Sequence, residues 1–320
     1  MKKPAKKSTR TTARRPAKSF ARKSTPEKFA PTEKPGGEKF TFFKLIFTAP
    51  VIIYAALLIL APIVYILFIS FLKRGTYGEL VYEPTLENYL DIFDPTFLGI
   101  LLRSVGIGLL ATLICLLISY PFAIALRKKS PKTQNLISKL IMVPFLTNSL
   151  IRTYAWVTLL RKNGVINSAL IATGLISTPL NLMYNNLGVV IGMVYTLLPF
   201  MLLPLIAAVQ KVDQNLLDAA SDLGAGPLKK FFKVYVPLTI SGAFNGCIMV
   251  FTPAIGYFFI ADILGGGKAM IIGNLIKNQF LTARNWPLGA ALSIFLLLLT
   301  YLIIQIYKRL GGNMDELGNS

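Results

Sequence analysis

Six long apolar stretches dominate the sequence and restrict the folds that are open to it. A helix needs about 20 apolar residues to cross a hydrocarbon core of about 30 Å, and each stretch reaches that length. The hydrophobic content of 54% over 320 residues agrees with this. We therefore predict an all-α integral membrane protein with about six transmembrane helices. The predicted spans are Leu45–Leu72, Leu98–Leu126, Leu136–Leu160, Leu187–Val209, Leu238–Ile263 and Leu288–Tyr307.

The distribution of basic residues between alternate loops predicts the orientation of these spans. Loops rich in Lys and Arg are retained on the cytoplasmic side of a membrane. Of the 34 Lys and Arg residues, 25 lie in residues 1–44, 127–139 and 211–233 and at the C-terminal end, against seven in the alternate loops. We expect both termini and the loop 211–237 to face the cytoplasm.

The first 44 residues differ in composition from the spans. They are rich in Lys, Arg, Pro, Ser and Thr and contain too few apolar residues to offset the entropy of ordering the chain. We predict a disordered cytoplasmic tail over residues 1–44, a membrane domain over 45–310 and a short cytoplasmic tail over 311–320. No short apolar core with a cleavage site precedes the first span, so the tail is not expected to be a secretory signal. Contact with anionic membrane lipids accounts for its charge, and no nucleic acid is expected as a partner.

Several classes of chemistry are excluded by the residue types that are missing. The chain has no His, which rules out a Ser-His-Asp triad and a His-ligated metal. Cys115 and Cys247 have the spacing of neither a metal site nor a disulfide framework, and we interpret them as packing residues. The run Gly265–Lys268 lacks the first Gly and the final Ser or Thr of a phosphate-binding loop. We predict a non-catalytic chain that holds no cofactor and no metal.

A short polar segment between the fourth and fifth spans has clear helix signals. Asp213 is a candidate N-cap, residues 214–223 are good helix formers and Gly224 is a candidate C-terminal stop. Three apolar residues lie at positions i, i+4 and i+7, and two acidic residues lie at i and i+4. The two carboxylates repel each other unless a basic group lies close to them. The apolar residues are Leu216, Ala220 and Leu223, and the acidic ones are Asp218 and Asp222.

A second short helix is expected to follow this one. Gly226 and Pro227 restart the chain, because Pro is accepted at the first turn of a helix. We expect this helix to run towards Val236 and to end at Pro237, where the fifth span begins. The two helices would form a compact projection on the cytoplasmic side.

The complete pattern of this segment resembles the cytoplasmic coupling loop of ABC importer permeases. Asp218-Ala219-Ala220, Gly224 and Val234–Pro237 have the same spacing, with Asp218 in place of the usual Glu. An ordinary amphipathic loop is the alternative reading. The resemblance implies that this segment docks on a separate ATPase. The candidate coupling residues are Asp218, Ala219, Ala220, Asp222, Gly224 and Pro237.

Most of the membrane domain resembles the B-type permeases of bacterial spermidine/putrescine ABC importers. The segments that carry the resemblance are Thr147–Arg152, Leu198–Met201, Asp218–Gly242, Asp262–Gly266 and Asn285–Ala290. It implies a type I ABC importer permease architecture in the bacterial inner membrane. The implied partners are a pair of ATPase subunits that bind ATP and Mg, a second, C-type permease, an external polyamine-binding protein and membrane lipids.

Asp262 is the first candidate for contact with a polyamine along the pore. It lies near the external end of the fifth span, and a polyamine needs carboxylates for its ammonium groups and aromatic faces between them. Asp262 could instead reach interfacial water or pair with Arg152, and an aromatic belt also accounts for Trp156. The candidate pathway residues are Asp262, Tyr257, Phe258, Phe259 and Trp156.

Three other functions remain open at this stage. The chain could be an ABC permease for a different small solute, a secondary transporter, or a receptor or scaffold without a pore. A secondary transporter would show charges at mid-depth in the membrane or paired broken helices. The absence of a nucleotide motif, together with the coupling pattern, favours an ABC permease.

Overall fold

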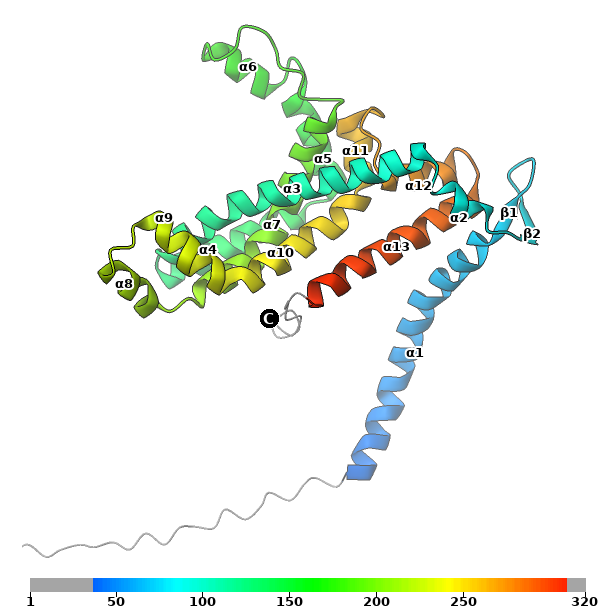
Figure 1. Ribbon diagram of the computed structural model, residues 1–320, viewed down its shortest axis with the longest axis horizontal. Coiled ribbons are helices and arrows are strands. Elements are labelled where there is room, and N and C mark those ends of the chain that lie inside the picture. The colour runs from blue at the N-terminus through cyan, green and yellow to red at the C-terminus, as the bar shows by residue number, and fades with distance from the viewer. Residues whose placement is uncertain (1–36, 310–320) are drawn as a thin grey trace, which may run out of the picture. The chain divides into compact units, whose positions relative to one another are not determined.

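The computed structural model describes residues 37–309, with side chains from residue 48 to residue 306. Almost all secondary structure within this range is helical (Figure 1). The elements in chain order are α1 (Gly37–Ser70), β1 (Leu72–Arg74), β2 (Leu80–Pro84), α2 (Glu87–Asp91), α3 (Pro95–Arg127), α4 (Pro131–Met142), the 3-10 turn η1 (Val143–Leu146), α5 (Ser149–Leu160), α6 (Val165–Ala172), α7 (Asn186–Gln210), α8 (Gln214–Asp222), α9 (Pro227–Lys230), the π-helical segment η2 (Phe231–Tyr235), α10 (Val236–Gly256), α11 (Phe258–Gly265), α12 (Ile272–Leu281) and α13 (Trp286–Arg309).

The chain forms two units, residues 1–57 and residues 58–320, which divide within α1. The described part of the first unit is the start of α1, and this helix includes residues 37–44, which the composition assigned to the tail. The rest of the predicted N-terminal tail and the predicted tail 311–320 lie outside the described residues.

Within residues 37–309, five helices are long and apolar enough to cross a membrane. They correspond to five of the six predicted spans, and in four of them the ends differ by one to three residues. The predicted fifth span, Leu238–Ile263, is wrong at both ends, because the helix starts 11 residues earlier and breaks after Gly256. The stretches concerned are Thr48–Ser70, Pro95–Arg127, Asn186–Gln210, Pro227–Gly256 and Trp286–Ile306.

The third predicted span, Leu136–Leu160, is a broken helix. Helix α4 passes into the 3-10 turn η1, which contains Pro144, and α5 then starts at Ser149. Proline removes a helical hydrogen bond, and Asn148 caps the new helix by accepting a hydrogen bond from Leu150 N–H at 2.8 Å. The stretch is apolar enough for a span, but a stop signal and a start signal lie in its middle.

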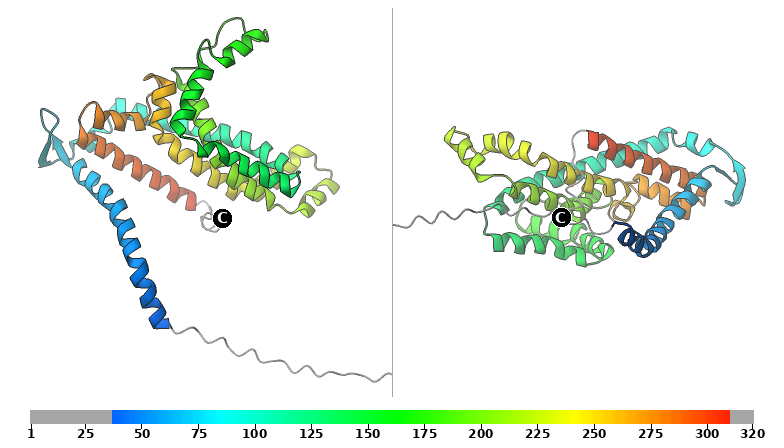
Figure 2. Two further views of the ribbon diagram at one scale, coloured as in Figure 1. Left: turned by 180° about the vertical axis from the view of Figure 1, so that it is seen from behind. Right: turned by 90° about the horizontal axis from the view of Figure 1, so that it is seen from below.

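Helices α3, α7 and α10 pack against one another and form the centre of the second unit (Figures 1 and 2). Glycines allow α7 to pack closely against α10 and against α11. A Cβ atom at Gly242 of α10 would lie 2.9 Å from the Pro204 carbonyl oxygen of α7. At Gly192 of α7 it would lie 2.5 Å from Leu264 Cδ1 of α11. Gly188, one turn before Gly192 on α7, also lies against Leu264, so both glycines serve helix packing.

The acidic loop between the first two spans folds into a small hairpin followed by α2. Strands β1 and β2 pair antiparallel, with Lys73 opposite Val81. The buried Asn88 amide donates to the carbonyl oxygens of Ser70 and Leu72 at 3.0 and 2.8 Å. The Arg74 guanidinium donates to the Ala283 carbonyl oxygen at 2.7 Å, which ties the hairpin to the segment before α13. Helices α8 and α9 lie at the opposite end of the second unit (Figure 1).

Candidate functional site

Helix α8 forms where the sequence predicts a helix, and both of its ends are capped. The Asp213 carboxylate accepts a hydrogen bond from Asn215 N–H at 2.9 Å. At the other end Gly224 has a φ of 72°, a left-handed conformation that glycine adopts without strain. Its N–H donates to the Ser221 carbonyl oxygen at 2.8 Å, and Ala225 N–H donates to that of Ala220 at 2.9 Å. The chain therefore turns sharply at Gly224.

The face of α8 that anchors it to the protein differs from the predicted apolar stripe. Leu217 is the buried residue, with 5% exposure, whereas Leu216 and Leu223 are 49% and 88% exposed. Leu217 packs in a cluster with residues of α3 and α7. Leu216 and Leu223 of the predicted stripe therefore point away from the chain, and Ala220 between them is half-buried. Sequence reasoning missed Leu217 because an apolar stripe alone does not say which side of a helix meets its own protein.

The acidic residues of α8 are exposed, and basic side chains lie close to one of them. Asp218 Oδ1 accepts a hydrogen bond from Gln214 Nε2 at 2.9 Å. Asp218 also lines a cavity of about 360 Å³ together with the basic residues Arg127, Lys128 and Lys230. Lys230 reaches back from α9 and donates to the Ser221 hydroxyl, so α8 and α9 are held together across the turn.

Arg127, at the end of α3, joins three elements at this end of the protein. Its guanidinium donates to the Val212 carbonyl oxygen at 2.7 Å, just before α8, and to the Tyr235 hydroxyl at 3.0 Å. Gln134 of α4 donates to the Arg127 carbonyl oxygen at 3.0 Å and accepts from Gln210 of α7 at 3.0 Å. In the sequence, Arg127 is only one of the basic residues that predict the orientation of the spans in the membrane. No local motif identifies its partners, because they are 85 and 108 residues away.

Pro237 does not end the second short helix, so this prediction is wrong. Helix α9, the π-helical segment η2 and α10 follow one another without a break, and they form one apolar stretch, Pro227–Gly256. Val236 N–H donates to the Phe231 carbonyl oxygen, the wider bonding pattern of a π-helix. Pro237 lies in the first turn of α10, where its missing N–H removes no bond of that helix.

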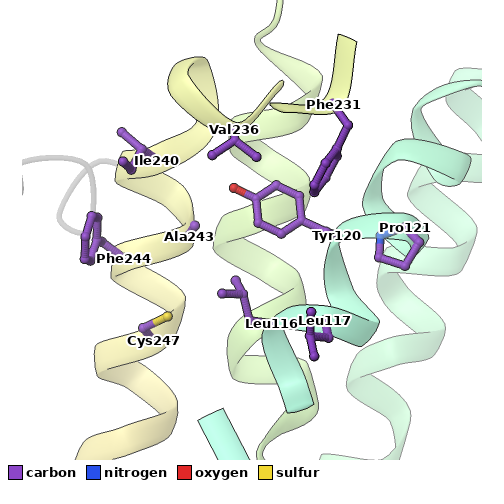
Figure 3. A pocket seen from close by; sticks show the side chains of 10 residues that line it. All are labelled: Leu116, Leu117, Tyr120, Pro121, Phe231, Val236, Ile240, Ala243, Phe244 and Cys247. Carbon is purple, nitrogen blue, oxygen red and sulfur yellow. The ribbon is translucent and has the colours of Figure 1, made fainter. Parts of the chain in front are cut away.

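An apolar cavity of about 350 Å³ lies between α3 and α10, beside the π-helical segment. Figure 3 shows Phe231 and Tyr120 on one side of it and Cys247 on α10. The Tyr120 hydroxyl is hydrogen-bonded to the Thr239 hydroxyl at 3.2 Å, and its ring meets Phe231 edge to face. Its walls carry no charged side chain, so this cavity offers no carboxylate to an ammonium ion.

Asp262 lies on α11 in a cluster with two residues of α12, which we call the Asp262 cluster (Asp262, Asn274 and Lys277). Asp262 Oδ1 accepts from Asn274 Nδ2 at 2.5 Å, and Oδ2 pairs with Lys277 Nζ at 2.5 Å. The predicted alternative, a pair with Arg152, is therefore wrong. Arg152 instead lies over the Phe145 ring, 5.4 Å from its centroid. Lys277 was missed because its position 15 residues further along the chain depends on the turn between the two helices.

Three of the predicted aromatic residues, Tyr257, Phe258 and Phe259, lie at the start of α11, shortly before Asp262. Tyr257 lies at the break between α10 and α11, with its ring 4.9 Å from that of Phe259. Phe258 lies 6.2 Å from Phe259, and its carbonyl oxygen accepts from Asn274. Trp156 of α5 packs against the same buried cluster as Tyr257 and Phe259. Phe258 and Phe259 precede Asp262 by four and three residues on α11, so their side chains lie on the same side of the helix as the carboxylate, as a site for an organic cation requires.

Among the described residues, no three His, Cys, Asp or Glu side chains come close enough to hold a metal ion. The chemistry that this part of the chain offers is hydrogen bonding, ion pairing and aromatic contact.

Comparison with known proteins places these features in a family. Residues 40–315 match the family described as binding-protein-dependent transport system inner membrane component. The chain is 43% identical over 267 residues to the spermidine/putrescine transport system permease protein PotB of Haemophilus influenzae, which covers 83% of this chain and 93% of that protein. It is also 43% identical over 256 residues to PotB of Escherichia coli, covering 80% and 93% of the two chains.

A solved structure has the same fold. In the crystal structure of a bacterial alginate ABC transporter in complex with an alginate pentasaccharide-bound periplasmic protein, one chain matches with a TM-score of 0.67 at 14% identity. The match covers 84% of this chain and 93% of that chain. The predicted architecture, that of an ABC importer permease, is confirmed. The chain belongs to the family of binding-protein-dependent transport system inner-membrane components.

Proposed function

We propose that this chain is a permease subunit of an ATP-driven importer for the polyamines spermidine and putrescine. The observation that carries the proposal is the 43% identity to PotB proteins, which are named for spermidine and putrescine transport. The chain forms one half of the pore, and a second, C-type permease forms the other. An external polyamine-binding protein delivers the solute.

A separate pair of ATPase subunits, which bind ATP and Mg, supplies the energy for transport. This chain itself is not catalytic. The coupling segment, residues 211–237, docks on an ATPase through the outward face of α8. Two features support this proposal: the exposed stripe of Leu216 and Leu223, and the exposed Asp218 and Asp222. Their apolar and acidic character fits a groove with matching apolar and basic side chains.

Two connections transmit a movement of α8 to the membrane-spanning helices. One is the continuous helix from Pro227 to Gly256, which starts directly after the turn at Gly224. The other is the Arg127 guanidinium, which joins the segment to α3. Closure of the ATPase pair shifts α8, and the two connections pass the shift to α10 and α3, which turns the pore towards the external side.

The solute pathway runs past the external end of α10. We propose Asp262, Tyr257, Phe258, Phe259 and Trp156 as residues of this pathway. The carboxylate attracts an ammonium group, and the rings offer faces to the cation and to the methylenes between charges.

Two substitutions test the coupling role in the reconstituted transporter. Asp218→Arg reverses the charge on the docking face, and Gly224→Pro removes the left-handed turn. We expect both to abolish the stimulation of ATP hydrolysis by solute-loaded binding protein, while the complex still assembles. Lys132→Gln, an exposed change on α4, is the control and should keep full stimulation. Full stimulation of both test variants in an assembled complex would contradict the coupling role.

A further inference from the structure

The Asp262 carboxylate is held in one orientation by a buried amide. Asn274 is 3% exposed. Its Nδ2 donates to the Phe258 carbonyl oxygen at 2.9 Å and to Asp262 Oδ1 at 2.5 Å, and its Oδ1 accepts from Ile271 N–H at 3.2 Å. The amide is therefore bonded at both ends, and it fixes one carboxylate oxygen against α12.

The other carboxylate oxygen faces a partner that is free to leave. Lys277 Nζ lies 2.5 Å from Asp262 Oδ2, and the two side chains are 27% and 36% exposed. The pair is therefore partly exposed, and a lysine ammonium on its flexible stem can exchange such a partner for another.

Lysine also has the chemistry of the proposed cargo. Its side chain ends in a primary ammonium on a chain of methylenes, and so does each end of spermidine or putrescine. We propose that Lys277 occupies the Asp262 carboxylate in the empty pore and that a terminal ammonium of the polyamine displaces it during passage. This inference rests on the proposed function and adds to it a binding site for a primary alkylammonium.

The exchange is favourable for transport because the carboxylate keeps a cationic partner throughout. One ammonium replaces another on Oδ2, while Asn274 keeps the carboxylate in place. The methylenes of the solute then meet Phe258 and Phe259, which lie four and three residues before Asp262 on the same helix, α11. The released Lys277 ammonium competes for its former place, so the solute is not retained.

Binding of labelled spermidine to the complete transporter in nanodiscs tests this inference. Lys277→Met removes the competitor, and we expect the half-saturating concentration to fall by about threefold or more, the scale of a solvent-exposed ion pair. Lys277→Arg should raise it, because a guanidinium bonds a carboxylate through two N–H groups and leaves less readily. Asp262→Asn should raise it as well, and Lys277→Met should then have no effect in the Asp262→Asn background.

A matched control and two contrary outcomes complete the design. Lys268→Met removes an exposed lysine from the segment between α11 and α12 and should leave binding unchanged. Equal half-saturation for Lys277→Met, Lys277→Arg and the unaltered transporter would overturn the exchange, and so would a Lys277→Met effect that persists without the carboxylate. If the unaltered transporter imports other solutes and does not bind polyamines, the proposed substrate fails and the exchange fails with it.

Discussion

At the scale of single residues, Gly224 has the conformation that matters most for the coupling segment. Its φ of 72° lies in the left-handed region, and no atom lies within 4 Å of a Cβ built on it. A substitution that adds a side chain at this position therefore strains the backbone but causes no steric clash. Gly226, two residues further on, has the same open surroundings and an ordinary φ of −66°.

The substitution Gly224→Ala isolates the strain. We expect it to destabilise the turn after α8 by about 1 kcal/mol, the cost of a left-handed L-residue. The measurement is hydrogen exchange over residues 214–225, which should become several-fold faster, because the opening is local. Gly226→Ala should leave this exchange rate unchanged. Equal rates in Gly224→Ala and the unaltered chain would show that the turn does not need glycine.

Residue-level prediction from the sequence succeeded where the signal is local. The N-cap Asp213 and the stop at Gly224 depend on neighbours a few residues away, and both are confirmed. The partners of Asp262 and Arg127 depend on how distant helices meet, and no spacing rule carries that information. One of the alternatives for Asp262, a pair with Arg152, was wrong for this reason.

At the scale of helices, the closest packing is between α7 and α10. The Cβ of an alanine at Gly242 would collide with Ala208 Cβ and lie 2.9 Å from the Pro204 carbonyl oxygen. Neither atom is the end of a flexible side chain, so the helices would have to separate.

We expect Gly242→Ala to lower the free energy of unfolding by about 1 to 3 kcal/mol, the range for overpacked cores. Thermal unfolding of the purified protein in detergent measures this. Gly106→Ala is the matched control, because Gly106 lies inside α3 with no atom within 4 Å of its built Cβ. An unchanged melting temperature for Gly242→Ala would mean that the two helices yield easily.

The hydrogen bonds of Arg127 lead to a second prediction at this scale, about the stability of residues 212–235. Arg127→Gln removes the charged donor from the Val212 carbonyl oxygen and the Tyr235 hydroxyl. Hydrogen bonds to charged groups contribute about 1.5 to 3 kcal/mol, so hydrogen exchange over residues 212–235 should become faster. Lys128→Gln, which alters the exposed neighbour, should have little effect. Exchange rates that are the same in both variants would show that Arg127 does not hold this segment.

The sequence predicted most of the membrane-spanning helices but not the positions where helices break. Apolar length alone predicts α3, α7 and α13, because the bilayer demands it. Whether a proline breaks a helix depends on whether the backbone groups around it still find hydrogen-bond partners. Pro144 lies in the 3-10 turn that separates α4 from α5. Pro237 lies in the first turn of α10, directly after the π-helical segment η2, and the helix continues through it. The same residue type therefore interrupts one stretch and is tolerated in the other.

At the scale of the whole molecule, the charge distribution predicts which end faces the cytoplasm. We expect Leu223, at the end of α8, to be cytoplasmic, and Tyr77, in the turn of the hairpin, to be external. Single cysteines at these two exposed positions, with Cys115 and Cys247 replaced by Ala, test this in spheroplasts. A membrane-impermeant maleimide should label Tyr77→Cys in intact spheroplasts and Leu223→Cys only after lysis. The reverse pattern would contradict the orientation.

The central claim is that this chain is the permease through which an ATP-driven importer takes up polyamines. Uptake of labelled spermidine tests it most directly, in cells from which only this chain is removed and in the same cells after it is restored. We predict that removal abolishes energy-dependent spermidine uptake, that the unaltered chain restores it, and that the Asp218→Arg chain does not. Spermidine uptake that is unchanged by removal, alongside loss of uptake of another solute, would contradict the claim.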